Sequence, residues 1–256
     1  MPFIFSDSHC HLDCMGEYPP SSHPDFLHIT CGYSRKSNAK NFEIAKNNPN
    51  VFCCLGIAPQ EAMKFENVQE EIAHAESEIM AFHSQLPQKI VAIGEIGLDF
   101  HWAKNPHERE KQAQCFLSML SLAKRLSLPV VIHSRDSMDE VISVLERERP
   151  QKIMMHCYSG SEQQTKRLLP LGATLSIPPL RSKERKKAIK LAGMHNMVAE
   201  TDAPYIGKFP QDVQASIQMV ADALGIPFEE AQKAAVQNTM GFFGIGGLGI
   251  SGWENV

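Results

Sequence analysis

Residues 129–134, Pro-Val-Val-Ile-His-Ser, are the stretch that decides the fold, because they join a short apolar run to an ionisable side chain at its end. The apolar residues do not alternate with polar ones, which is typical of a parallel strand buried on both faces. Further segments along the chain have the same character. The sequence therefore predicts eight strands, at about 3–8, 25–31, 51–57, 89–95, 129–134, 152–157, 172–177 and 196–201.

Segments with helical patterning lie between and after these strands, at 68–86, 106–127, 137–149, 161–171, 182–193, 209–225 and 227–243. We expect every strand to be followed by a stretch that can cross back as a helix, which is the pattern of repeated βα units. Eight such units in 256 residues predict a (β/α)₈ TIM barrel. A doubly wound sheet is the structural alternative, because counting strands does not establish closure. We expect one barrel domain over residues 1–243 and a loosely ordered glycine-rich tail over 244–256, which Trp253 could anchor.

The composition is that of a globular protein, with 43% hydrophobic and 21% charged residues. The net charge of −4 gives no overall basic character, so any contact with nucleic acid must come from local charge. No apolar run approaches the roughly 20 residues of a membrane span, and the N-terminus lacks a signal-peptide pattern. The seven cysteines contain no CxxC pair and fit neither a disulfide framework nor a structural zinc site. These features predict a cytoplasmic protein with no membrane partner and no obligate protein partner.

Histidines and carboxylates gather where the predicted strands end, which is the edge where barrel enzymes carry their chemistry. His9 and His11 are two residues apart in an extended segment, so their side chains leave the same face and can share a cation. That pair alone is weak evidence, but other ionisable groups at strand ends would be costly to bury without partners or a metal; they are Glu95, His133, His156 and Asp202. This set exceeds the needs of one tetrahedral ion, and Glu95 has two oxygens that could bridge two ions. The sequence therefore predicts a two-metal centre for hydrolysis.

Five motifs occur in order along the chain: DSHCHLD at 7–13, GEIGLD at 94–99, PVVIHSR at 129–135, HCYSG at 156–160 and ETDAPY at 200–205. Together they resemble the TatD family of metal-dependent deoxyribonucleases, within the amidohydrolase-like barrel superfamily. The resemblance implies two divalent ions (Mg²⁺, Mn²⁺ or Zn²⁺), one held by His9, His11, Glu95 and Asp202 and the other by Glu95, His133 and His156. It also implies that Glu95 is the bridge and that Asp202 is the general base, a role that suits a carboxylate beside the attacking water.

Three further aspartates stand in or beside these motifs. Asp7 is expected behind the His9/His11 pair, as an acceptor for an imidazole N–H. Asp13 and Asp99 either do similar work or cap a following turn or helix.

The chain departs from the family pattern in two places. After the third predicted strand most members carry Gly-x-His-Pro-His, whereas residues 56–60 here read Gly-Ile-Ala-Pro-Gln. After ETDAPY the usual insertion, of the type Arg-Gly-x-x-Asn-Glu-Pro, is contracted to Ile-Gly-Lys-Phe-Pro at 206–210. The metal ligands are unaffected, but substrate contacts on these two stretches, including one basic contact to phosphate, do not transfer to this chain.

The resemblance implies DNA as the substrate, and a barrel mouth suits an exonuclease that takes single-stranded or frayed ends. Phosphate contacts would need cations at the mouth, where Arg135 and Arg181 lie on predicted loops. Other basic residues either contribute or form solvated helix faces; they are Arg35, Lys36, Arg185, Lys186, Lys187 and Lys190. Aromatic residues of the same loops either stack on a terminal base or pack within the loops; they are Tyr158, Tyr205, Phe100 and Trp102.

Two other functions stay open. An amidohydrolase-like enzyme could cleave a small amide or ester, in deacylation or editing, because such a centre activates water without choosing the electrophile. A binding or scaffold protein could keep the fold without the chemistry, although all six expected ligands are present.

Overall fold

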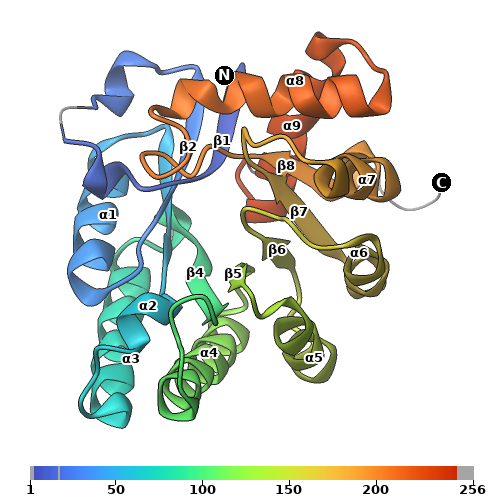
Figure 1. Cartoon of the computed structure of the whole chain (residues 1–256). Helices are drawn as coiled ribbons and strands as arrows, with labels where there is room; N and C mark the ends of the chain where they lie inside the picture. Colours follow the sequence, from blue (N-terminus) through green and yellow to red (C-terminus); the bar gives the residue numbers. More distant parts are fainter. Residues whose placement is uncertain (1–2, 17, 247–256) are drawn as a thin grey trace.

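The computed structural model describes residues 3–16 and 18–246. Eight parallel strands neighbour one another in chain order: β1 (Phe5–Cys10), β2 (Phe26–Cys31), β3 (Val51–Leu55), β4 (Ile90–Asp99), β5 (Val130–Arg135), β6 (Ile153–Met155), β7 (Ala173–Ile177) and β8 (Met197–Ala199). After β8 the chain meets β1, where the Asp202 amide donates to the His9 carbonyl at 2.9 Å and the His11 amide to the Ala203 carbonyl at 2.7 Å. The strands form a nearly closed barrel (Figure 1), as predicted, and the doubly wound alternative is wrong.

Helices surround the barrel on its outside (Figure 1). They are α1 (Arg35–Asn47), α2 (Pro59–Ala62), α3 (Val68–Gln85), α4 (Pro106–Leu126), α5 (Met138–Glu148), α6 (Glu162–Leu168), α7 (Lys183–Ala192), α8 (Val213–Leu224) and α9 (Phe228–Phe243). The expectation of a helical stretch after every strand is wrong after β1, where the described residues form only short 3₁₀ turns at Leu12–Cys14 and Pro20–Ser22. Helix α1 was not singled out because its sequence is mostly polar; Ser34 caps it by accepting from the Ser37 amide.

Buried apolar side chains form two layers. In the outer layer, strand residues such as Leu55 and Ile132 belong to one cluster with Phe116 and Met119 of α4. Alternate positions of the strands form a second cluster, which includes Phe242 and Phe243 at the end of α9 as well as Leu27, Ile29, Ala92, Val131, Met154 and Val198. Burial on both faces is the reason why the strands read as continuous apolar runs.

Strand β4 continues to Asp99, so Glu95 lies within the strand and not at its end, where the sequence placed it. The pairing of β4 with β5 shifts register between Ile93 and Ile96. Gly94 permits a close approach of the two strands here, because a Cβ atom at this position would lie 2.5 Å from Cβ of Val131. The strand therefore brings a carboxylate into the barrel without leaving the sheet.

None of the described helices is long and apolar enough to cross a membrane. Helix α9 ends at Phe243, and Gly244 follows it with a φ of 66°. This is the point where the glycine-rich tail was expected to begin. Most of that tail, residues 247–256 with Trp253, lies outside the described residues, so the division into barrel and tail stays a prediction.

Candidate metal centre

The six expected ligands meet at the C-terminal end of the barrel. They come from five strands or from the residues directly after them: His9 and His11 from β1, Glu95 from β4, His133 from β5, His156 after β6 and Asp202 after β8. They make up two of the three groups of candidate ligands among the described residues, and the third joins His9 and His156 to Glu200.

The first group is formed by His9, His11 and Asp202, with Glu95 beside them. The two Nε2 atoms of His9 and His11 lie 3.2 Å apart, and Asp202 Oδ1 lies 3.6 and 3.3 Å from them. Glu95 Oε2 lies 3.8 Å from the first of these nitrogens and 3.7 Å from the second. The Cys31 carbonyl lies 2.8 Å from His11 Nδ1, which makes that nitrogen the donor and leaves the Nε2 lone pair facing the group.

The second group is formed by Glu95, His133 and His156. Glu95 Oε1 lies 2.8 Å from His133 Nδ1 and 3.9 Å from His156 Nε2. Each oxygen of Glu95 therefore faces a different group of histidines, which is the arrangement that a bridging carboxylate needs.

The donor set fits divalent cations. His9 is wholly buried, and its Nδ1 has no hydrogen-bond partner within residues 3–16 and 18–246. Its Nε2 faces another imidazole nitrogen and two carboxylates at distances that a bound ion would fill. Because burying polar groups in this way is costly, a cation accepting their lone pairs would stabilise the arrangement.

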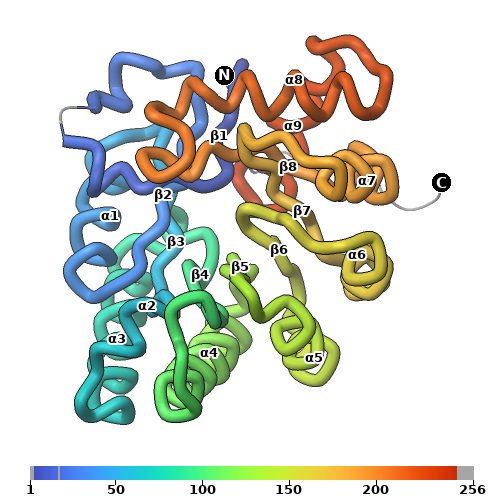
Figure 2. Tube along the Cα trace, viewed as in Figure 1, coloured from blue at the N-terminus to red at the C-terminus, as the bar shows by residue number. Residues whose placement is uncertain are grey.

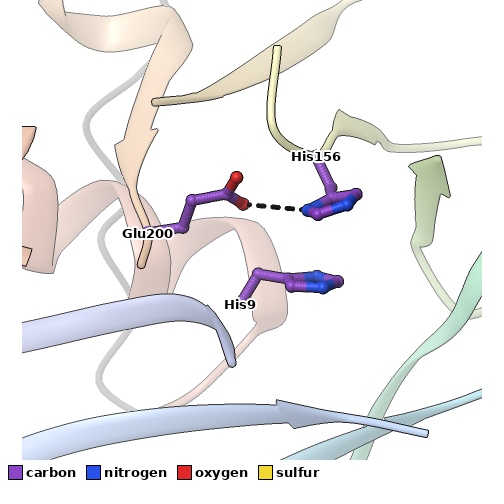
Figure 3. Close-up of side chains that lie close together, drawn as sticks. All are labelled: His9, His156 and Glu200. Atoms are coloured by element: carbon purple, nitrogen blue, oxygen red, sulfur yellow. Dashed lines mark hydrogen bonds and ion pairs between the residues drawn. The ribbon is translucent and has the colours of Figure 1, made fainter. Parts of the chain in front are cut away.

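Glu200, which the sequence analysis did not single out, lies behind His156. Figure 3 shows its carboxylate beside the imidazole, with Oε2 at 3.3 Å from His156 Nδ1. The Cys157 amide and the Ser176 hydroxyl both donate to this carboxylate at 2.6 Å. The His9 ring lies parallel to that of His156, with centroids 3.8 Å apart. The sequence position of Glu200 could have identified it, because an acidic residue directly after an apolar strand needs a buried partner.

Asp99 performs both roles that the sequence left open. Its Oδ2 lies 3.1 Å from His133 Nε2 and accepts from Gln60 Nε2 at 2.7 Å. Its Oδ1 accepts from the backbone amides of His101 and Trp102, so it also caps the turn after β4. Gln60, which stands where the family pattern has its second histidine, thus helps to fix the carboxylate that orients His133.

Asp7 and Asp13 accept hydrogen bonds that fix the loops beside the metal ligands. Asp7 accepts from the Thr201 amide at 2.9 Å, from the His9 amide at 3.2 Å and from the Thr201 hydroxyl. The expectation that it accepts an imidazole N–H is therefore wrong, because backbone amides occupy Oδ1 and the Thr201 hydroxyl occupies Oδ2. Asp13 Oδ2 accepts from the Ser37 hydroxyl at 2.7 Å, which attaches the segment after β1 to α1.

Carboxylates dominate the electrostatics of the centre. Burial alone would lower the pKa of His156, but Glu200 and the other nearby carboxylates raise it to about 10. Burial also opposes the charged form of His133, where Asp99 and Glu95 raise the pKa to about 9. Burial would raise the pKa of Glu95, yet the hydrogen bond and charge of His133 hold it well below its usual range. A site that stabilises imidazolium so strongly is negative enough to stabilise a metal cation.

Two of the expected substrate contacts lie at the open end of the barrel. Tyr205 is 62% exposed, and its ring centroid lies 5.1 Å from that of His11. Arg135 is exposed at the end of β5 and lines a hollow together with Ser159 and Gln164. Arg181 is also exposed, but its guanidinium lies 3.5 Å from a carboxylate oxygen of Asp222.

Other expected substrate contacts are located elsewhere or are already paired. Tyr158 is fully buried, with its hydroxyl 2.9 Å from that of Thr165, so the expectation that its ring stacks on a base is wrong. Arg185 is also buried, and its Nε donates to the Tyr158 carbonyl at 3.0 Å, so it is neither a phosphate contact nor part of a solvated face. Arg35 is paired with carboxylates of α3.

The remaining aromatic and basic residues that the sequence suggested as substrate contacts are exposed or contact nearby side chains. Trp102 is 55% exposed. Phe100 packs under the Arg109 guanidinium, and Lys187 pairs with Glu184 within α7.

A family model described as "TatD related DNase" matches residues 6–244. The chain belongs to the TatD family. It is a metal-dependent hydrolase of that family, in agreement with the buried cluster of histidines and carboxylates at the end of its barrel.

Relatives agree over nearly the whole chain. "Deoxyribonuclease TATDN3" of Homo sapiens is 27% identical over 265 residues, covering 93% of each chain. "Uncharacterized metal-dependent hydrolase YabD" of Bacillus subtilis is 26% identical over 231 residues, covering 85% of this chain and 87% of the relative. The crystal structure of YJJV, a TatD homolog from Escherichia coli, matches with a TM-score of 0.80 at 24% identity, covering 96% of this chain and all of that one, and shows that the fold is shared.

Proposed function

We propose that this TatD-family hydrolase cleaves phosphodiester bonds of DNA with a two-metal centre, working as an exonuclease on single-stranded or frayed ends. The observation that carries the proposal is Glu95, whose two oxygens face two separate groups of histidines. The human relative is named a deoxyribonuclease, which supports DNA as the substrate.

In this proposal one divalent ion (Mg²⁺, Mn²⁺ or Zn²⁺) is held by His9, His11, Glu95 and Asp202, and a second by Glu95, His133 and His156. Two cations bound there would lower the pKa of a shared water and neutralise charge on phosphoryl oxygens. Asp202 is the general base: its Oδ1 faces the two β1 histidines, while its Oδ2 makes no hydrogen bond to any described residue. This oxygen would take a proton from the water that attacks phosphorus.

The substrate contacts proposed are Arg135, Arg181 and Tyr205. The arginines would pair with backbone phosphates, and the exposed Tyr205 ring beside His11 would meet the terminal base. Tyr158 is not among them because it is buried.

The test is hydrolysis of an end-labelled single-stranded oligonucleotide by metal-stripped protein, with Mg²⁺, Mn²⁺ or Zn²⁺ added back. We expect metal-dependent loss of terminal nucleotides, and a decrease of about 10²–10⁴-fold in Asp202→Asn. Asp25→Asn, at an exposed aspartate directly before β2, is the matched control and should keep full activity. Protein that binds two ions yet cleaves no oligonucleotide would refute the proposal.

A second candidate is amidohydrolase-like cleavage of a small amide or ester. It is favoured by the small number of free cations near the centre, since Arg185 is buried and Arg181 lies beside a carboxylate. Turnover of small esters or amides without any cleavage of DNA would establish it. The convergence of all six ligands argues against a scaffold without chemistry.

We also propose the cytoplasm as the compartment, without a membrane or an obligate protein partner. All seven cysteines are free, and most are buried. Free thiols in this number are typical of a reducing compartment.

A further inference from the structure

A hollow of about 480 Å³ lies between two segments that are far apart in sequence, the connection after β1 and the stretch after β8. It is lined by Met15, Tyr18, Pro19, His23, Phe209 and Gln211. In Figures 1 and 2 these segments are the blue connection from β1 to β2 and the orange stretch between β8 and α8, which lie side by side at the upper left. We call this site the aromatic hollow.

The rings of the aromatic hollow are nearly parallel. The Tyr18 ring makes an angle of 15° with His23, at a centroid distance of 5.8 Å, and of 25° with Phe209, at 6.4 Å. Phe209 is 43% exposed, so much of its surface is open to a ligand. Flat ring faces of this kind bind other flat rings by stacking.

The central ring is held in place from two sides. The Tyr18 hydroxyl lies 2.9 Å from Nε2 of His28 on β2 and accepts from Gln211 Nε2 at 2.8 Å. These contacts tie the connection after β1 both to the barrel wall and to the segment after β8. The Tyr18 ring of the aromatic hollow is therefore held in one orientation before a ligand binds, which reduces the entropic cost of binding.

A lysine side chain lies at the edge of the aromatic hollow. Lys208 Nζ lies 5.3 Å from the Phe209 ring centroid and makes no ion pair with a described residue. Asp212, the nearest acidic group on this segment, accepts from the backbone amides of Lys208 and Phe209 and so holds the turn. An aromatic face beside a free ammonium is the combination that binds one nucleotide, with its base on the ring and its phosphate at the cation.

The walls of the hollow continue the segments that carry the metal ligands. Met15 and Tyr18 follow His11, while Lys208 and Phe209 follow Asp202. Between the hollow and the centre, Cys14 Sγ lies 3.7 Å from the Tyr205 hydroxyl. Tyr205 and Phe209 are four residues apart on the same segment, so a strand that leaves the metal centre past Tyr205 would next meet Phe209.

We propose that the aromatic hollow binds a nucleobase of the DNA strand whose end lies at the metal centre, with Lys208 against the adjoining phosphate. This inference rests on the proposed function, because it takes the same strand as ligand. It makes Phe209 and Tyr18 determinants of affinity for oligonucleotides and leaves the hydrolytic chemistry to the centre.

The test compares Phe209→Ala with wild type on two substrates: a single-stranded oligonucleotide of eight nucleotides, and the p-nitrophenyl ester of thymidine monophosphate, which is too small to span both sites. We expect KM for the oligonucleotide to rise about tenfold, the loss of one base stack, while kinetics on the small diester stay unchanged. Leu117→Ala, an exposed apolar truncation on α4, is the matched control. An unchanged KM for the oligonucleotide would overturn the inference.

Equilibrium binding separates this inference from the proposed function. Oligonucleotides with 2-aminopurine at successive positions should show fluorescence quenching at one position in wild type, and the quenching should be lost in Phe209→Ala. Lys208→Gln should lower the salt dependence of binding by about one phosphate contact. If wild type cleaves neither substrate, the proposed function fails, and the same binding data still decide the hollow: equal quenching in both proteins would refute it.

Discussion

Replacing Glu200 with glutamine tests how the protein prepares His156 to bind a cation. The carboxylate accepts three hydrogen bonds, from His156 Nδ1, the Cys157 amide and the Ser176 hydroxyl. A cation that displaces the Nε2 proton of His156 would leave the other proton on Nδ1, pointing to Glu200, with the Nε2 lone pair directed toward Glu95 and the second ligand group. A glutamine whose oxygen keeps the Cys157 amide turns its NH₂ group toward Nδ1, so the imidazole proton moves to Nε2, the nitrogen needed for the metal.

The magnitude follows from the bonds that change. A hydrogen bond to a charged group contributes about 1.5–3 kcal/mol and a neutral one about 1 kcal/mol, so the exchange costs about 1–2 kcal/mol. That energy corresponds to about 5–30-fold in affinity, which overlaps the range of about 10–100-fold known for partners behind metal ligands. Affinity for the first cation, proposed to be held by His9 and His11, should change far less because Glu200 makes no hydrogen bond or ion pair with either.

The assay is calorimetric titration of metal-stripped Glu200→Gln with Zn²⁺ or Mn²⁺, next to wild type and to Glu184→Gln, an exposed glutamate of α7. We expect each protein to bind two cations. Glu200→Gln should weaken the binding of the second cation only, and Glu184→Gln should weaken neither. Two cation affinities within twofold of wild type, in a variant with an unchanged circular dichroism spectrum, would show that Glu200 does not orient His156.

Three further predictions concern stability. Gly160→Ala should lower Tm by several degrees, because the new Cβ would lie 2.3 Å from the hydroxyl of Tyr158. Gly241→Ala should raise Tm slightly, because a Cβ in this helix would meet nothing within 4 Å. Thermal melts of the two variants and wild type check both predictions. Burial lowers the pKa of His28 to about 3, so below pH 6.5 the unfolded chain takes up a proton that the folded chain does not. The free energy of unfolding should therefore fall with decreasing pH, by up to about 1.4 kcal/mol per pH unit. Urea titrations at pH 7 and 5 check this, and an equally steep fall in His28→Gln would contradict it. Arg185→Ala should destabilise the protein by about 2 kcal/mol because it leaves buried carbonyls without a donor, while the exposed Lys186→Ala should be neutral in the same denaturation experiment.

Much of the fold could be predicted because barrel strands are buried on both faces and therefore read as apolar runs. The elements that were missed lack this signal. Helix α1 is short of apolar residues, and the connection after β1 packs through Tyr18 and short 3₁₀ turns without an α-helix. The extension of β4 beyond Glu95 was missed because an acidic residue in the middle of a buried strand reads as its end.

The ligand positions could be predicted because chemistry in a barrel gathers at strand ends. The partners behind them could not, since Glu200 and Gln60 contact His156 and Asp99 only through the folded geometry. The same holds for the burial of Tyr158 and Arg185, whose sequence neighbours are polar and exposed in character. Their positions depend on how the loops after β6 and β7 pack on each other.

The location of Glu95 inside β4 also bears on how the protein can evolve. Its backbone amide donates to the carbonyl of Gly32, directly after β2, at 3.0 Å, and ladder pairs with β5 resume on its C-terminal side. The carboxylate shared by the two ligand groups therefore belongs to a strand and not to a loop at the mouth. The two stretches where this chain departs from the family pattern, 56–60 and 206–210, contribute none of the six candidate ligands, so these stretches can change while the ligand groups stay the same.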